Sequence, residues 1–416
     1  MMNDEVQLQS GMDMEMSPAH RVVIVGAGVG GAELAMALRR DGHEGEIVLV
    51  GNEGHPPYDR PPLSKKALIE GSAADRLYLR AASTYAQASV DLRLGAPVVA
   101  LDPAAREVRM VDGGTIRFDR CVLATGAAPR IPPIPGIGLP GVFVLRDLDD
   151  MTALRAAAGN ARNAVILGGG YLGLELAASL RRLGLAVMVV EAAGSLLARS
   201  ASTLCASALL ARHEMAGTRV LTGARVSAVR GATAVEGLEL SDGRFVSADL
   251  VVCAIGARPR IELAEAAGIA CDNGILTGET CETGLPGIYA IGDCANWLSP
   301  TLGRRRRLES IQAATFQARI VSAAICGKPV PAERIPYFWS EQFDDKLQIA
   351  GVVDPAAPCR DEVVGDLDGD FAVYRFQRDT LAAVEALNRP RDFVLAQRLI
   401  GKPGISMPPS CERDTA

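Results

Sequence analysis

Two glycine-rich segments have the residue types and spacing of loops that bind the phosphates of a dinucleotide. Both follow the pattern G-x-G-x-x-G, at Gly26, Gly28 and Gly31 and again at Gly168, Gly170 and Gly173. The first glycine of such a motif makes a tight turn, the second lets the backbone approach a pyrophosphate, and the third lets helix and strand pack closely. Amide groups at the start of the next helix then face the phosphates. The repeat therefore predicts two dinucleotide sites in one chain.

The residues around each motif predict the strand, turn, helix and strand that the motif requires. A β-branched run precedes the glycines, a helical pattern follows them, and a second β-branched run comes next. These segments cover residues 21–25, 32–40 and 46–51 in the first copy and 164–168, 174–184 and 186–191 in the second. The predicted fold class is α/β, with two Rossmann-like dinucleotide-binding domains.

The end of the second strand in each unit indicates which dinucleotide binds. In the second unit this residue is Glu191, whose carboxylate can accept hydrogen bonds from both ribose hydroxyls and would repel a 2′-phosphate. The next arginine, Arg199, does not follow immediately, so this site is predicted to prefer NADH. In the first unit Asn52 or Glu53 must bond the ribose, and Asn52 could do so without charge. The dinucleotide that naturally exchanges electrons with NADH is FAD.

Two further segments support FAD. Residues 122–130, VLATGAAPR, read as a strand entering a glycine turn, and they resemble the crossover by which a chain leaves an FAD domain, with Thr125 and Gly126 in the turn. The segment GIYAIGDC resembles a second FAD motif. There Asp293 would bond the ribityl chain and the Gly292 backbone would make room for it.

Composition excludes several other classes of protein. The formal net charge of −6 argues against nucleic acid or an anionic membrane as a partner, and no apolar run reaches the roughly 18 residues of a membrane span. The first 20 residues contain four acids and no lysine or arginine, so they predict a disordered tail and no secretory signal. Nine cysteines without a C-x-x-C pair and four scattered histidines predict no metal site and a cytoplasmic protein.

Taken together, these segments resemble the FAD/NAD-linked reductases built like glutathione reductase. Within that group the chain is most similar to the NADH-dependent ferredoxin reductases that serve Rieske dioxygenases and bacterial haem monooxygenases. The decisive segment is PYDRPPLSKKAL at 57–68, and the resemblance extends over about 20–390 through GGGYLGLE, NGILTGETCETGLPGIYAIGDC, RLESIQAATFQA and YFWSEQFDDKLQIAG. It implies that electrons pass from NADH through FAD to a small acidic [2Fe-2S] ferredoxin.

The resemblance also implies roles for individual residues. Lys65 would approach the flavin and pair with Glu175, which would also bond the nicotinamide amide. Val98 and Arg130 match FAD-contacting positions, and the backbone at Ile311 would meet the flavin ring. Trp339 could cover the isoalloxazine or be a buried core residue.

The resulting set of expected site residues is large. For FAD it comprises Gly26, Gly28, Gly30, Gly31, Asn52, Lys65, Val98, Thr125, Gly126, Arg130, Gly292, Asp293, Ile311 and Trp339. For NADH it comprises Gly168, Gly170, Tyr171, Leu172, Gly173, Glu175, Glu191, Arg199 and Gly256. Lys65 and Glu175 are the expected catalytic residues, and no metal ligand is expected.

Some alternatives stay open at this point. The arginine run at 304–307 is either a solvated loop or a docking patch for an acidic ferredoxin through Arg306 and Arg307. The acceptor could instead be rubredoxin or another carrier, and a regulatory protein that binds FAD and NADH is a candidate of another class. The absence of cysteine between 20 and 121 argues against disulfide reductases and single-cysteine oxidases of this fold.

The order of the motifs predicts how the chain divides. An FAD-binding domain takes 20–135 and 271–335, an NAD-binding domain is inserted at 136–270, and a C-terminal α+β domain covers 336–416. Residues 371–377 and 381–387 read as a β-hairpin followed by a helix that begins at the NRP segment. A monomer or a weak homodimer is expected.

Overall fold

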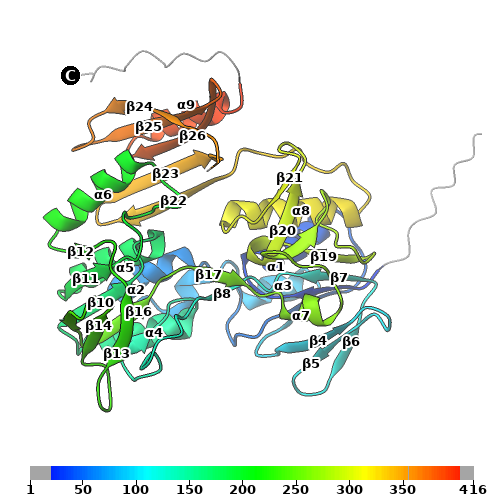
Figure 1. Cartoon of the computed structure of the whole chain (residues 1–416). Helices are drawn as coiled ribbons and strands as arrows, with labels where there is room; N and C mark the ends of the chain where they lie inside the picture. Colours follow the sequence, from blue (N-terminus) through cyan, green and yellow to red (C-terminus); the bar gives the residue numbers. More distant parts are fainter. Residues whose placement is uncertain (1–19, 355, 403–416) are drawn as a thin grey trace, which may run out of the picture.

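The computed structural model describes residues 20–354 and 356–402. These residues form two α/β lobes side by side and a smaller C-terminal lobe that stands above one of them (Figure 1). The acidic tail at 1–19 and the segment after residue 402 lie outside the described residues. Within the described ranges, every helix is too short or too polar to cross a membrane.

The first lobe is built on a parallel sheet in the order β19-β7-β1-β2-β3. Its strands are β1 (Val22–Val25), β2 (Ile47–Val50), β3 (Val90–Arg93), β7 (Arg120–Leu123) and β19 (Ile288–Ala290). All four residues of β1 are buried, because successive side chains point to opposite faces and both faces are covered. Val22 and Ile24 pack with the helices α1 (Val29–Arg40) and α8 (Ile311–Ile325).

The opposite face of that sheet is covered by antiparallel strands and a short helix. Val23 and Val25 share a buried cluster with residues of β4 to β6 and α7. These elements are β4 (Val98–Asp102), β5 (Glu107–Met110), β6 (Thr115–Arg117) and α7 (Glu262–Ala266). The lobe is completed by α3 (Ala82–Gln87), β18 (Ile275–Thr277), the 3-10 helix η3 (Gly292–Cys294), β20 (Ala295–Ser299) and β21 (Arg304–Arg306).

The second lobe repeats the parallel architecture in the order β12-β11-β10-β16-β9. Its strands are β9 (Val142–Phe143), β10 (Asn163–Leu167), β11 (Ala186–Val190), β12 (Arg219–Leu221) and β16 (Leu250–Cys253). Its helices are α4 (Leu148–Ala158), α5 (Tyr171–Arg182) and α6 (Thr203–Met215), and an antiparallel sheet is formed by β13 (Val226–Arg230), β14 (Gly237–Leu240) and β15 (Phe245–Ser247). The predicted pair of Rossmann-like domains is therefore present.

Two short antiparallel strands carry the chain between these lobes. They are β8 (Ala127–Pro129) and β17 (Ala257–Pro259). After β17 the chain returns at once to the first lobe, since Ala264 and Ile269 are buried with its core. The return therefore lies near residue 260, and the prediction of 271 placed it too late. The departure also comes earlier than 135, because Ile134 packs against the core of the second lobe.

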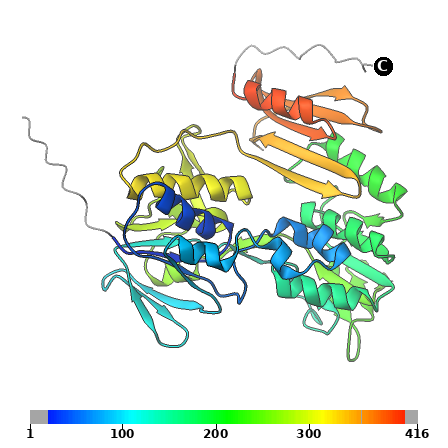
Figure 2. The ribbon, with the colours of Figure 1, turned by 180° about the vertical axis from the view of Figure 1, so that it is seen from behind.

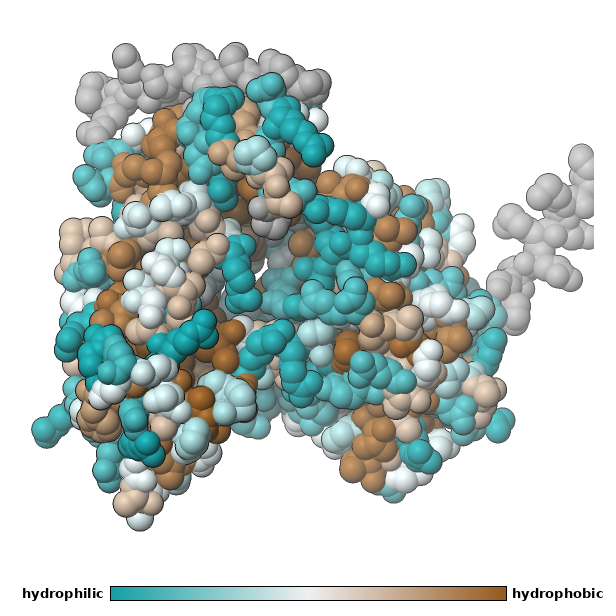
Figure 3. Space-filling view, viewed as in Figure 1, coloured by the Kyte–Doolittle hydropathy of each residue, from teal (hydrophilic) through white to brown (hydrophobic). Residues whose placement is uncertain are grey.

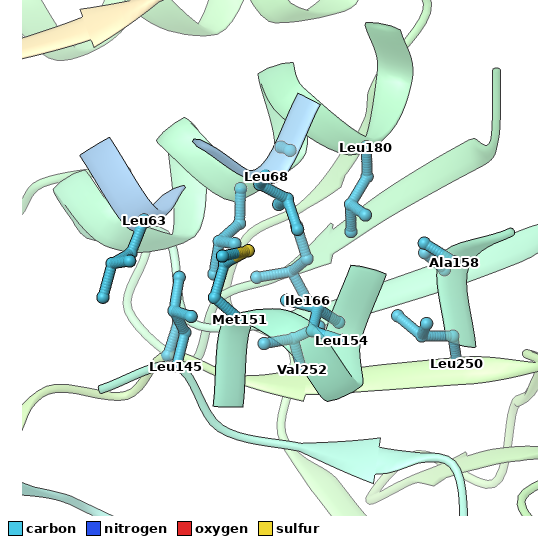
Figure 4. Close-up of a cluster of buried hydrophobic side chains, with 14 of the residues drawn as sticks. Leu63, Leu68, Leu145, Met151, Leu154, Ala158, Ile166, Leu180, Leu250 and Val252 are labelled. Atoms are coloured by element: carbon cyan, nitrogen blue, oxygen red, sulfur yellow. The ribbon is translucent and has the colours of Figure 1, made fainter. Parts of the chain in front are cut away.

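A segment of the first domain's sequence packs on the second lobe. It contains the 3-10 helices η1 (Pro61–Ser64) and η2 (Ala74–Leu77) and the helix α2 (Lys66–Glu70). Leu63 and Leu68 enter a buried cluster with Met151, Leu154 and Leu180 of the second lobe (Figure 4). The sequence prediction assigned this segment to the FAD-binding domain, but its apolar side chains are buried on the other lobe.

The C-terminal lobe is an antiparallel sheet in the order β22-β23-β26-β25-β24. Its strands are β22 (Tyr337–Gln342), β23 (Asp345–Gly351), β24 (Arg360–Gly365), β25 (Phe371–Gln377) and β26 (Thr380–Leu387). One face packs on α5 and α6, and the helix α9 (Pro390–Leu399) covers the other, as the view from behind shows (Figure 2). The predicted hairpin corresponds to β25 and β26, and the predicted final helix corresponds to α9.

Candidate functional site

One continuous cleft of about 1840 Å³ connects both glycine motifs. Its walls come from all three lobes, and the surface is hollowed and largely hydrophilic where they meet (Figure 3). The carboxyl ends of the parallel strands open into this cleft, which is where α/β sheets of this topology bind their ligands. Two dinucleotides can therefore approach each other in one cavity.

The first motif forms a cradle whose shape depends on its glycines. Gly26 has φ of +116°, and a Cβ there would lie 2.1 Å from the Ala124 carbonyl oxygen. A Cβ on Gly31 would lie 2.0 Å from the Gly26 oxygen, so α1 can pack this close only without a side chain. In contrast, a Cβ on Gly28 would meet nothing within 4 Å, because it would project into the cleft. The open space at Gly28 fits a pyrophosphate at the start of α1.

The second motif repeats this geometry closely. Gly168 has φ of +109° and a Cβ on Gly173 would lie 2.0 Å from the Gly168 oxygen. Gly170 faces the cleft with open space where a Cβ would be. Tyr171 and Leu172 begin α5 and also line the cleft, and the Tyr171 ring packs edge-on against Phe338 of the C-terminal lobe at 4.9 Å.

Lys65 and Glu175 meet between the two motifs. Lys65 Nζ lies 2.8 Å from Glu175 Oε2, and the side chains are only 14 % and 9 % exposed. The Ser64 hydroxyl donates to the same oxygen at 2.6 Å, and the Ser340 hydroxyl donates to Oε1 at 2.8 Å. Burial makes such an ion pair costly to break from one side, because the remaining charge would be unpaired. The arrangement holds an ammonium group at the edge of the cleft.

Two of the hydroxyl groups that donate to this carboxylate, those of Ser64 and Ser340, were not predicted from sequence. Ser64 precedes Lys65 in the PPLSK segment, so the motif itself could have indicated it. Ser340 lies 165 positions from Glu175 in sequence, and its contact arises only when β22 packs on α5.

Glu191 is held by backbone amides at the end of β11. Its Oε2 accepts from the Gly169 amide at 2.6 Å and its Oε1 accepts from the Ala193 amide at 2.7 Å. These bonds fix the carboxylate at the cleft wall and join it to the glycine loop. Arg199 lines the same part of the cleft near Gly256, and so does Arg225, which no sequence pattern singled out.

The structure distinguishes between Asn52 and Glu53, the two candidates for the residue that bonds the ribose of the first dinucleotide. Glu53 is occupied by the Tyr58 hydroxyl and by Arg60, whose Nη2 lies 2.5 Å from Oε1. Burial is the main cause that raises the pKa of Tyr58, so this hydroxyl stays a donor. Asn52 is exposed at the cleft. The geometry therefore favours Asn52 as the ribose ligand.

Asp293 lies at the far end of the first site. Its carboxylate pairs with Arg146 at 3.1 Å, and Gly292 before it has φ of +74° with its amide donating to Gln317 at 2.7 Å. Ile311 begins α8 at the cleft wall, where the helix N-terminus adds a positive dipole end. Arg146 was not predicted, because it comes from the second lobe, between β9 and α4, and lies 147 positions from Asp293 in sequence.

Most of the remaining predicted residues also reach the cleft. Those that line it are Gly30, Thr125, Gly126, Arg130 and Trp339. Thr125 and Arg130 additionally tie the crossing strands together, through bonds to the carbonyls of Arg260 at 2.7 Å and Ala257 at 2.9 Å. Val98 differs, because its side chain packs against the core of the first lobe.

The arginine run is less free than its sequence suggests. Arg307 has a side chain only 12 % exposed, lines the cleft, pairs with Glu309 and donates to the Asp293 carbonyl at 3.3 Å. Burial lowers the pKa of Arg306, which is half-buried in β21. Arg304 and Arg305 are the exposed members of the run.

Cys253 lines the cleft, and burial raises the pKa of its thiol to about 11, which makes it a poor nucleophile near pH 7. The eight cysteines within the described residues are all free. Cys294 follows Asp293, but it is fully buried and burial raises the pKa of its thiol. A thiol in that state is a poor nucleophile. The same part of the chain holds no group of three or more side chains suited to a metal ion.

Comparison with known proteins decides the family. The model of the pyridine nucleotide-disulphide oxidoreductase family matches residues 20–318, and a reductase C-terminal model matches 337–415. The chain belongs to the pyridine nucleotide-disulphide oxidoreductase family. It is 39 % identical to rhodocoxin reductase of Rhodococcus erythropolis over 91 % of this chain and 89 % of that protein. It is 38 % identical to the ferredoxin–NAD(+) reductase component of the biphenyl dioxygenase system of Paraburkholderia xenovorans, over 91 % and 93 %.

A solved structure agrees with this assignment. The covalent complex of putidaredoxin reductase with putidaredoxin superimposes with a TM-score of 0.88 at 36 % identity, over 91 % of this chain and 92 % of that one. Members of the pyridine nucleotide-disulphide oxidoreductase family use FAD and NAD(P)H, and the two glycine cradles fit these dinucleotides. The family is named for a disulfide, but no cysteine of the described residues forms one.

Proposed function

We propose that this protein is an FAD-containing NADH:ferredoxin reductase that supplies electrons to an oxygenase. The observation that carries the proposal is the buried Lys65–Glu175 pair, which lies between two dinucleotide cradles in one cleft. The free cysteines support it, because a disulfide reductase would need a redox pair beside the flavin. The named relatives are reductases of the same kind.

Each site residue then has a role in binding or orientation. When bound, FAD accepts two electrons from NADH and passes them singly to a one-electron carrier. Gly28 and Gly170 would give the two pyrophosphates access to backbone amides, and Asn52 and Asp293 would bind the ribose and ribityl hydroxyls of FAD. Lys65 holds a positive charge at the cleft, and Glu175 fixes that charge and would accept from the nicotinamide amide. Trp339, which lines the cleft from the C-terminal lobe, would cover the flavin.

Anaerobic titration tests the proposal. The purified protein should show a flavin spectrum that one equivalent of NADH bleaches, and oxidised putidaredoxin should then restore it. Restoration by rubredoxin or a dye alone would favour the alternative acceptors. A yellow protein that NADH does not bleach would support the regulatory alternative, and a colourless protein would refute the FAD site. We further propose a cytoplasmic monomer or weak homodimer, consistent with the scattered free cysteines.

We propose that Glu191 selects NADH over NADPH, and Glu191→Ala tests this. The change removes the acceptors of the Gly169 and Ala193 amides together with those of the ribose. Since a hydrogen bond to a charged group contributes about 1.5–3 kcal/mol, the Kd for NADH should rise about 10- to 100-fold. NADPH, which gains no acceptor, should then be bound almost as well as NADH. Glu214→Ala, on an exposed position of α6, is the control, and an unchanged preference would refute the role.

We propose that the arginine run docks the ferredoxin. Substitutions of Arg306 and of Arg307 are expected to have different effects on the reduction of ferredoxin and of a small dye. Arg306→Gln should lower kcat/KM for putidaredoxin about 3- to 10-fold at low salt, with a smaller effect at high salt, because facing charges mainly accelerate encounter. Reduction of a small dye should not change. Arg307→Gln should lower both reactions, since Arg307 lies in the cleft wall beside Asp293. Equal losses with dye and ferredoxin in Arg306→Gln would remove the docking role.

A further inference from the structure

A series of buried polar side chains extends from Glu175 away from the cleft. It runs from Glu175 on α5 through Ser340 and Gln342 on β22 to His213 on α6. Their exposed fractions are 7 %, 1 %, 3 % and 0 %. The successive heavy-atom distances are 2.8, 3.1 and 2.9 Å. Polar groups buried this completely are costly unless each is hydrogen-bonded, so the series needs an explanation.

The chemistry of these groups fixes the direction of every hydrogen bond. The Glu175 carboxylate only accepts, so the Ser340 hydroxyl must donate its single proton to Oε1. Ser340 Oγ must then accept from the Gln342 amide nitrogen, which leaves Gln342 Oε1 to face the histidine. His213 therefore donates from Nε2. Its Nδ1 is buried without a hydrogen-bond partner among residues 20–354 and 356–402, which suits a bare lone pair.

The surroundings of His213 favour the neutral form of its ring. Burial is the largest cause that lowers the pKa of His213, and the ring packs against Phe343 at 5.0 Å. A neutral histidine has one N–H, so donation from Nε2 toward Gln342 is compatible with an unprotonated Nδ1. All donors in the series consequently point toward Glu175.

The consequence is that the carboxylate is held at both oxygens. Oε1 receives Ser340, while Oε2 receives Ser64 and Lys65. Without the bond from Ser340, the carboxylate would be fixed at one oxygen only and could rotate about its terminal bond. Rotation would displace the oxygen that holds the Lys65 ammonium.

Strand β22 gives this contact a further significance. Adjacent residues of a strand point to opposite faces, and Trp339 lines the cleft while Ser340 is buried against Glu175. Lys65 comes from the FAD-binding segment, Glu175 from the NAD-binding lobe and Ser340 from the C-terminal lobe. All three parts of the chain meet at one carboxylate.

We propose that Ser340 is a positioning residue for Glu175, and that Gln342 and His213 hold Ser340 in its donating orientation. The C-terminal lobe thereby completes the site that orients Lys65 and the nicotinamide. This inference rests on the proposed function, because it assigns the series a part in flavin reduction by NADH.

Substitutions at Ser340 separate positioning from packing. Ser340→Ala removes the hydroxyl and keeps the volume, whereas Ser340→Thr keeps the hydroxyl and adds a methyl group to a full interior, which costs stability. We expect the rate constant for flavin reduction at saturating NADH to fall about tenfold in Ser340→Ala and to stay within twofold in Ser340→Thr. The Kd for NADH should change less than the rate. The proposal would be overturned if the flavin-reduction rate fell in the two variants in proportion to the fall in their melting temperatures. It would also be overturned if Ser340→Ala reduced its flavin at the unmodified rate.

A spectroscopic measurement tests the orientation independently of turnover. With ¹⁵N-labelled histidine, the His213 signals, assigned by their loss in His213→Asn, should show a neutral ring protonated at Nε2 at pH 6. Gln342→Met should shift these signals. A ring protonated at Nδ1 would mean that Nε2 accepts a hydrogen bond from Gln342, which would reverse the direction of donation along the series and refute the proposal. If NADH fails to reduce the flavin of the unmodified protein, the proposed function fails instead, and the tautomer still decides the direction of the hydrogen bonds.

Discussion

Lys65→Met is expected to lower the rate constant for flavin reduction by NADH about 100- to 1000-fold, the loss typical of removing one preorganised charged donor from a water-poor site. Methionine retains the length and apolar stem of lysine. Within the described part of the chain, it leaves the Glu175 carboxylate with the Ser64 and Ser340 hydroxyls as its side-chain donors, at 2.6 and 2.8 Å. Stopped-flow absorbance at saturating NADH measures the rate without depending on any ferredoxin.

The neighbouring lysine supplies a matched control. The Lys66 side chain is 76 % exposed and lies 3.9 Å from Glu70 at its end, so Lys66→Met should leave the rate unchanged. Stability must be followed alongside, because an unpaired buried carboxylate can cost about 3–5 kcal/mol. The double variant Lys65→Met/Glu175→Gln carries neither charge and should regain stability but not rate. A Lys65→Met rate within threefold of the unmodified protein would remove Lys65 from the site.

Gly28→Ala is expected to yield a folded protein that retains less than a tenth of its FAD. In the protein alone a Cβ at this position meets nothing within 4 Å, and Gly28 has φ of −78°, which alanine adopts readily. The methyl group would instead occupy the space through which the pyrophosphate reaches the backbone. Because each lost bond to a charged group is worth about 1.5–3 kcal/mol, the FAD affinity should fall about 10- to 100-fold. The measurement is the ratio of flavin to protein absorbance, with the melting temperature of apoprotein as the test of folding.

Substitutions at two other glycines serve as controls for this experiment. Gly284→Ala, at an exposed position with no heavy atom within 4 Å of its Cβ, should retain FAD fully. Gly31→Ala should lose the fold together with FAD, since its Cβ would lie 2.0 Å from the Gly26 carbonyl oxygen. If Gly28→Ala keeps a full complement of FAD, the first cradle does not bind the pyrophosphate as proposed.

The local architecture could be predicted from sequence because local residue patterns dictate it. Residues 22–25 are all β-branched and all buried, the pattern of a central parallel strand covered on both faces. Gly26 and Gly168 need positive φ, and Gly31 and Gly173 need the absence of a Cβ. These demands are met within one βαβ unit, so spacing alone reveals them.

The meeting of distant segments was decided only by the tertiary structure. Leu63 and Leu68 bury their side chains with Met151 and Leu154 of the second lobe, although their sequence adjoins the first. That burial carries Lys65 to Glu175, a contact that only the family resemblance suggested. The same holds for the early return of the chain near residue 260.

Side-chain contacts that depend on how segments pack together are not visible in the local sequence pattern. The arginine run reads as a uniform basic patch, yet Arg307 lines the cleft wall, pairs with Glu309 and donates to the Asp293 carbonyl. Ser340 is an ordinary serine in its own strand, and it acquires a role only because β22 packs on α5. The sequence by itself determined the two dinucleotide cradles, since their constraints are local and steric. Which polar groups share one carboxylate was decided by hydrophobic packing between the lobes, since burial fixes the distances at which hydrogen bonds can form.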